Sequence, residues 1–67
     1  MLSIFGFSSK QEARRCARYC REFGVVVDVL PKNRFYDGVV QLRVNRKFEN
    51  LVYGAFRPFI CSYLVTD

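Results

Sequence analysis

Small apolar residues recur with helical spacing near the start of the chain, and this pattern constrains the fold more than any other feature. Ser9 and Glu12 form a capping box, a common helix start. The apolar side chains that follow fall at i, i+3, i+4 and i+7 of one helical face: Ala13, Cys16, Ala17, Cys20 and Phe23. Gly24 is typical of the position just beyond a helix. The pattern predicts a helix over residues 9–23.

Runs rich in β-branched and aromatic residues predict four strands. Residues 2–7 and 25–30 flank the predicted helix, residues 39–44 alternate with the period of two typical of a half-buried strand, and residues 59–65 close the chain. Proline, asparagine and glycine separate the second run from the third. These two runs are therefore expected to form a hairpin.

A second helix is predicted between the third and fourth runs. Asn45 can cap it, Pro58 can stop it, and an apolar face lies between them: Phe48, Leu51, Val52 and Ala55. The resulting order, β-α-β-β-α-β, predicts an α+β, ferredoxin-like two-layer sandwich, with a four-stranded antiparallel sheet and two helices on one face. The alternative is an α-β-β-α core in which the end segments pack only as extended coils.

Length and composition narrow the class of protein. A chain of 67 residues with 51% hydrophobic residues has material for one core, so a single domain over residues 1–67 is expected. No uncharged stretch approaches the roughly 20 apolar residues that a membrane span requires. The first residues lack the basic segment of a signal peptide, and an odd cysteine count of three fits a reducing compartment. We expect a cytoplasmic protein with no membrane partner.

Groups that carry catalysis or bind metals are sparse. The chain has no histidine, and its six acidic residues form no close pair in sequence. Cys16 and Cys20 lie one helical turn apart and Cys61 could approach them, but a structural zinc site takes four ligands. We therefore expect no enzyme, no cofactor and no metal, with the three thiols buried as small hydrophobes. The serines before the first helix could hold an anion at its N-terminus, or Ser9 could simply cap it.

Basic residues gather on the predicted helices. On a helical wheel they lie opposite the apolar face of the first helix and on the outer side of the second. They form the first candidate surface, for phosphates or an acidic protein partner: Lys10, Arg14, Arg18, Arg21, Arg46 and Arg57. The net charge is +5. The alternative is that these side chains bind nothing and only keep the protein soluble.

The sheet face turned away from the helices is the second candidate surface. If Val25, Val27, Val29, Val40, Leu42 and Val44 form the core, alternation places another set outside: Val26, Leu30, Val39, Gln41 and Arg43. The first strand is apolar on both sides, so either Leu2 and Ile4 or Phe5 and Phe7 face outward. A face this apolar favours self-association or cover by a partner.

Protein–protein contact is the function these features favour, either as a homodimer or by docking on a partner protein. In its size and its lack of catalytic groups, the chain resembles small stand-alone accessory or regulatory proteins, including those of phages and mobile elements. The alternative is a nucleic-acid-binding protein whose arginines contact the phosphate backbone. An RNA-binding sheet would need stacking aromatics on its first and third strands, but the third run offers only Gln41 and Arg43.

Overall fold

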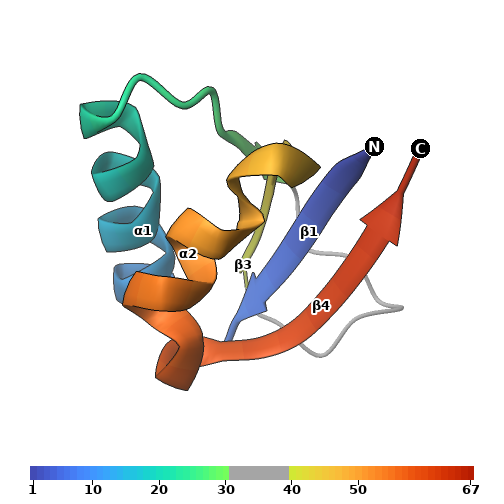
Figure 1. The fold of residues 1–67 in the computed structure, drawn as a ribbon. Helices are drawn as coiled ribbons and strands as arrows, with labels where there is room; N and C mark the ends of the chain where they lie inside the picture. The colour runs from blue at the N-terminus through green and yellow to red at the C-terminus, as the bar shows by residue number, and fades with distance from the viewer. Residues whose placement is uncertain (31–39) are drawn as a thin grey trace.

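The computed structural model describes residues 1–30 and 40–67 of the chain (Figure 1). Its elements follow the predicted β-α-β-β-α-β order: β1 (Leu2–Phe7), α1 (Lys10–Glu22), β2 (Asp28–Leu30), β3 (Val40–Asn45), η1 (Arg46–Phe48), α2 (Glu49–Phe56), η2 (Arg57–Phe59) and β4 (Ile60–Thr66). The two η elements are single 3-10 turns. Both helices lie on the same face of the sheet, so the α+β two-layer arrangement consistent with a ferredoxin-like fold is confirmed.

The sheet has the strand order β2-β3-β1-β4, and each neighbouring pair is antiparallel. β1 is central and pairs with β3 on one side and with β4 on the other. The alternative in which the end segments pack as coils is therefore wrong. The predicted hairpin partners do pair, since Val29 lies opposite Leu42.

Caps at both ends fix α1. The Ser9 hydroxyl accepts the N–H of Glu12 at 3.5 Å, so this serine caps the helix. At the other end Gly24 adopts a φ of +75°, and its N–H donates to the carbonyl of Arg21 at 3.0 Å. The N–H of Val25 donates to the carbonyl of Cys20, also at 3.0 Å, which completes a Schellman motif.

This cap corrects the predicted strand at residues 25–30. Because the backbone of Val25 closes the end of the helix, the chain enters the sheet late, and β2 spans only Asp28–Leu30. Val25 and Val27 are buried without lying in a strand, whereas Val26 between them is 79% exposed. The sequence pattern predicted the alternation of buried and exposed side chains correctly. Its prediction that these three residues pair in the sheet was wrong.

The start of α2 also differs from the prediction. Asn45 caps the 3-10 turn η1, where its side chain accepts the N–H of Lys47 at 3.1 Å, and α2 follows that turn. The buried side of α2 carries Val52 and Phe56, whereas Ala55, predicted on the apolar face, is exposed. The helix ends before η2, which contains Pro58.

The core lies between the sheet and the two helices. Its buried apolar residues come from every layer: Phe5, Phe7, Ala13, Cys16, Ala17, Cys20, Val25, Val27, Leu42, Val44, Val52 and Phe56. Small residues on α1 let this helix sit close to β1 and β3. Phe23, predicted to belong to this core, is 61% exposed because it lies at the C-cap, beyond the last turn that faces the sheet.

The register settles which face of β1 is buried. Phe5 pairs with Leu42 and Phe7 with Val40, and these side chains point toward the helices. Leu2 and Ile4 therefore lie on the face turned away from the helices. Since both β1 phenylalanines are fully buried under the helices, they cannot stack bases as an RNA-binding sheet of this type requires.

Candidate binding groove

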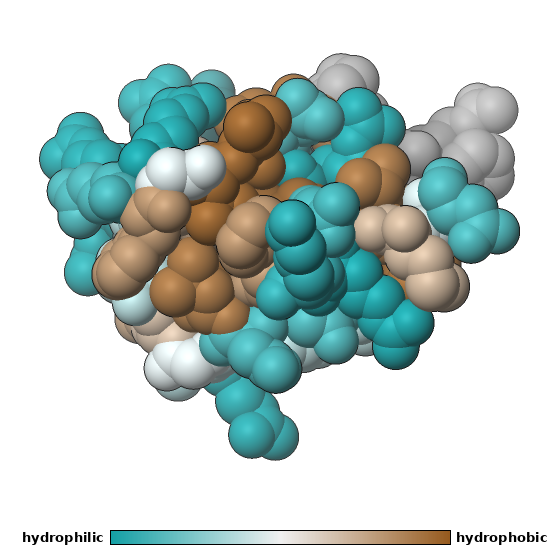
Figure 2. Space-filling model, turned by 45° about the horizontal axis from the view of Figure 1, so that its top comes forward, coloured by the Kyte–Doolittle hydropathy of each residue, from teal (hydrophilic) through white to brown (hydrophobic). Residues whose placement is uncertain are grey.

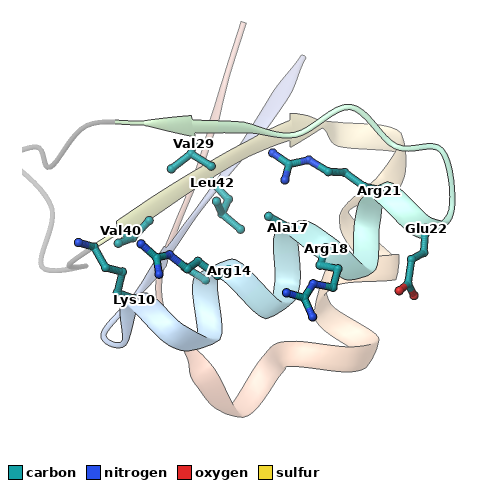
Figure 3. Close-up of a pocket in the computed structure, with 10 residues that line it drawn as sticks. Lys10, Arg14, Ala17, Arg18, Arg21, Glu22, Val29, Val40 and Leu42 are labelled. Atoms are coloured by element: carbon teal, nitrogen blue, oxygen red, sulfur yellow. The ribbon is translucent and has the colours of Figure 1, made fainter.

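A groove of about 590 Å³ runs between α1 and the β2 side of the sheet (Figure 3). Ten described residues line it: Lys10, Ala13, Arg14, Ala17, Arg18, Arg21, Glu22, Val29, Val40 and Leu42. It forms because α1 packs over β1 and β3, while β2 lies at the end of the sheet beyond the cover of the two described helices. Its volume lies within the range of about 300–1,000 Å³ that is common for ligand sites.

The floor of the groove is apolar. Ala13, Ala17 and Leu42 are at most 3% exposed, so their side chains close the bottom between helix and strand. Val29, predicted as a core residue, is instead 56% exposed. Its side chain does point to the helix side of the sheet, but neither α1 nor α2 packs over this edge strand. The valine therefore forms an open apolar wall.

Basic side chains from α1 form the rim of the groove. We use the term arginine rim for Lys10, Arg14, Arg18 and Arg21, which are all exposed and line the groove. In Figure 3, Arg14 and Arg21 reach from the helix toward the strands, whereas Glu22 points away from them. The sequence places these side chains opposite the apolar face. The structure adds that they stand beside an apolar wall rather than facing only solvent.

The charges of the arginine rim are not used within the described part of the chain. The three ion pairs among the described residues join Arg15 to Glu12, Arg43 to Asp28, and Arg46 to Glu49, and none includes a rim residue. Like charges four residues apart on a helix destabilise it by about 0.2–0.5 kcal/mol per pair. The rim thus carries a small stability cost that no described ion pair offsets.

Two of the predicted basic residues lie apart from this groove. Arg46 lies in the η1 turn, where its backbone N–H donates to the carbonyl of Met1 at 3.1 Å and its side chain approaches Glu49. Arg57 lines a separate hollow beside α2, with Asn50, Tyr53 and Gly54. The predicted single basic surface is therefore divided into an arginine rim and two isolated arginines.

The predicted sheet-face residues have different positions. Alternation from the register places Leu30, Gln41 and Arg43 together on the face turned away from the helices. Gln41 is only 1% exposed, and Arg43 pairs with Asp28 at 3.1 Å across the neighbouring strand. Val26 does not belong to this face, because it precedes β2 in the connection from α1. Val39 lies outside the described residues.

A row of aromatic rings crosses the helical layer and was not predicted. Phe23 contacts Tyr19 with ring centroids 5.0 Å apart, Tyr19 contacts Phe56 at 5.6 Å, and Phe56 contacts Phe59 at 6.3 Å. The two end rings are 61% and 40% exposed. On the face drawn in Figure 2, apolar side chains form a broad area bordered by hydrophilic ones. The molecule therefore has apolar surface outside the groove as well.

The three cysteines do not converge. Cys16 and Cys20 are buried in the core, where burial and the neighbouring Cys20 raise the pKa of Cys16 to about 12. Cys61, predicted to be buried, is exposed at an irregularity of β4 and donates to the carbonyl of Gly6 at 3.3 Å. In the described ranges, no three cysteine or acidic side chains are grouped to hold a metal ion.

A polar cluster around Glu49 joins α2 to the sheet, and no sequence pattern indicated it. The hydroxyls of Ser3 and Tyr63 both donate to Oε2 of this glutamate, the first at 2.9 Å. The hydrogen bonds from Tyr63 and Ser3 lower the pKa of Glu49, and Arg46 acts in the same direction. None of the four residues lines the groove. Their arrangement positions elements of the fold.

The described lining of the groove consists of apolar and charged side chains. This described lining offers no hydroxyl, thiol or imidazole. Comparison with known proteins adds no further guide, since no family model, curated protein or solved structure gives a match. Neither α1 nor α2 combines the length and the apolarity that crossing a membrane demands.

Proposed function

We propose that this chain is a non-enzymatic binding protein that docks an acidic segment of a partner protein in the groove between α1 and β2. The observation that carries the proposal is the position of Val29, an exposed apolar wall across the groove from an arginine rim that forms no ion pair among the described residues. A ligand that fits must offer negative charge and apolar surface together. Acidic protein segments with interspersed aliphatic residues have both properties.

Three further features support a regulatory or accessory role. The chain has no histidine, its groove offers no hydroxyl, thiol or imidazole among the described residues, and its cysteines are free, as expected for a protein of the cytoplasm. Affinity would come from the apolar floor, and the rim would speed association by attracting the partner. Binding of this kind needs no cofactor.

Nucleic acid is the second candidate ligand, and one observation favours it. Lys10, Arg14 and Arg18 recur every four residues along one helix, a spacing that suits contacts to successive phosphates. Two observations weigh against it: the groove has no aromatic ring among its described lining, and Arg46 and Arg57 stand apart. A phosphate backbone would also leave the Val29 wall without a partner.

The test compares designed peptides with nucleic acid on the same protein. The first probe is a short peptide with glutamate and valine taking turns at its odd positions and threonine at its even positions, so that an extended chain presents both glutamate and valine on one face. Its two controls replace all glutamates by glutamine or all valines by serine. We expect binding only when charge and apolar side chains are both present. Equal binding of the glutamate–serine peptide, or tighter binding of duplex or single-stranded DNA with a salt slope of about 0.7–0.9 per phosphate contact, would overturn the proposal.

A pair of valine variants separates groove contacts from general effects. Val29→Thr replaces a methyl group of the groove wall by a hydroxyl of similar size, whereas Val26→Thr makes the same change at a site that is 79% exposed and outside the groove. Only the first variant should weaken binding of the glutamate–valine peptide. DNA binding through phosphates should be indifferent to both. Equal effects of the two variants on the peptide would contradict docking in the groove.

A further inference from the structure

The strand β2, at the edge of the sheet beside the groove, could pair through its backbone with a strand of the partner. β2 lies at the end of the strand order and has one strand neighbour, β3, among the described residues. One side of an edge strand presents backbone N–H and C=O groups that its own sheet does not use. This inference rests on the proposed function and concerns how the partner segment is held.

The position of Val29 links that edge to the groove. Val29 pairs with Leu42 on the helix side of the sheet, and both side chains line the groove. A strand added beside β2 would place alternate side chains next to Val29, since directly opposite residues lie about 4.5–5.5 Å apart. Those side chains would fill the groove and end beneath Arg14 and Arg21, which reach toward the strands in Figure 3.

The face of β2 turned away from the helices restricts which side chains a partner strand can place beside it. Asp28 points there and is held by Arg43 at 3.1 Å, with Leu30 beside it on the same face. An acidic side chain placed against Asp28 would be repelled. The partner strand should therefore carry its negative charge on the groove side and neutral residues on the other.

We propose that the partner segment binds as an additional strand on β2, with backbone pairing to Asp28–Leu30 and acidic side chains toward the arginine rim. A helix, about 10–12 Å across with its side chains, would leave the β2 backbone unpaired. A second copy of the chain is disfavoured by charge, because β2-to-β2 pairing would bring two arginine rims together on chains of +5 each. An added strand would pair with the backbone of β2, and its acidic side chains would lie near the positive charge of the arginine rim.

Backbone N-methylation of the glutamate–valine peptide tests this mode without altering the protein. Methyl groups on alternate residues block one edge of the peptide strand, and methyl groups on the intervening residues block the other. We expect one isomer to bind about tenfold more weakly than the parent peptide and the other to bind nearly as well. The parent peptide should also slow hydrogen exchange of the outward amides of Asp28–Leu30.

The outcomes separate the binding mode from the proposed function. If both isomers bind like the parent peptide while Arg14→Gln still weakens binding, strand addition is wrong and groove docking stands. If the parent peptide does not bind, or binds regardless of the arginine rim, the proposed function itself fails. Slow exchange at β2 in the peptide-free protein, together with a concentration-dependent dimer, would identify a second copy as the occupant and contradict the inference.

Discussion

Tyr63 donates its hydroxyl to the carboxylate of Glu49, and this hydrogen bond ties the last strand to the second helix. Ser3, which is fully buried on β1, donates to the same carboxylate oxygen at 2.9 Å. One acidic side chain thus holds three elements that are distant in sequence. Charge-assisted hydrogen bonds of this kind are stronger than neutral ones.

Stability should fall in acid partly through Glu49. The hydrogen bonds from Tyr63 and Ser3 lower the pKa of this carboxyl from its ordinary 4.5. Its contribution to the free energy of unfolding is therefore present above pH 4.5 and lost as the pH falls through the lowered pKa. Unfolding experiments between neutral and acidic pH should show a shallower loss for Tyr63→Phe than for the wild type.

The hydrogen bond between Tyr63 and Glu49 should also make stability depend on pH in the alkaline range. Glu49 raises the pKa of Tyr63 above its ordinary 10.0, so the contribution of this tyrosine is full below pH 10.0 and is lost as the pH rises through the raised value. Tyr53→Phe, which keeps the hydrogen bond between Tyr63 and Glu49, should leave the acid dependence unchanged. An acid slope for Tyr63→Phe identical to that of the wild type would show that the hydrogen bond does not stabilise the fold.

Thiol reactivity should distinguish the three cysteines. Cys61 is exposed, whereas Cys16 and Cys20 are fully buried and burial raises the pKa of both thiols. Because the thiolate is the reactive form, an alkylating reagent should modify Cys61 first in the native protein. Mass spectrometry of partly labelled protein checks this order. Labelling of Cys16 or Cys20 at the rate of Cys61 would contradict their burial.

Cys20→Ser should destabilise the protein by about 1–3 kcal/mol, because a hydroxyl replaces a thiol in an apolar site. The matched substitution Cys61→Ser should cost less than about 0.5 kcal/mol, since the site is exposed. Its hydroxyl can also still donate to the carbonyl of Gly6. Denaturant unfolding of the two variants measures the difference, and equal losses would show that Cys20 is not a core residue.

Removing the arginine rim should not cost stability. Arg14, Arg18 and Arg21 are exposed and absent from the ion pairs of the described residues, so changing them to Gln should alter unfolding by at most about 0.5 kcal/mol each. At low salt the triple variant should gain stability as repulsion is relieved. A large loss, measured by thermal unfolding, would mean that the rim is structural.

Much of the fold was predictable because local signals agreed with one another. The capping box at Ser9, the spacing of Ala13, Cys16, Ala17 and Cys20, and the β-branched runs specified the element order. Errors occurred where tertiary position decides burial. Phe23 and Val29 have core-type side chains, but one lies past the last helical turn and the other on an edge strand. Residue type alone does not carry that information.

The candidate site was predictable only as a set of side chains. Helical periodicity placed Lys10, Arg14, Arg18 and Arg21 together, but the groove depends on where α1 lies across the sheet. The Tyr63–Glu49 contact joins residues 14 positions apart with no recurring pattern between them. Both features arise from packing between elements, which periodicity within one element cannot report.

The most direct test of groove docking compares two double variants that lower the net charge of +5 by the same amount. Arg14→Gln/Arg21→Gln removes charge from the rim, and Arg46→Gln/Arg57→Gln removes it elsewhere. The measurement is the affinity of each for the glutamate–valine peptide at low salt. We expect the rim variant to bind about tenfold more weakly and the control to change less than about twofold. Equal losses in the two variants would mean that net charge alone attracts the peptide, and would contradict docking in the groove.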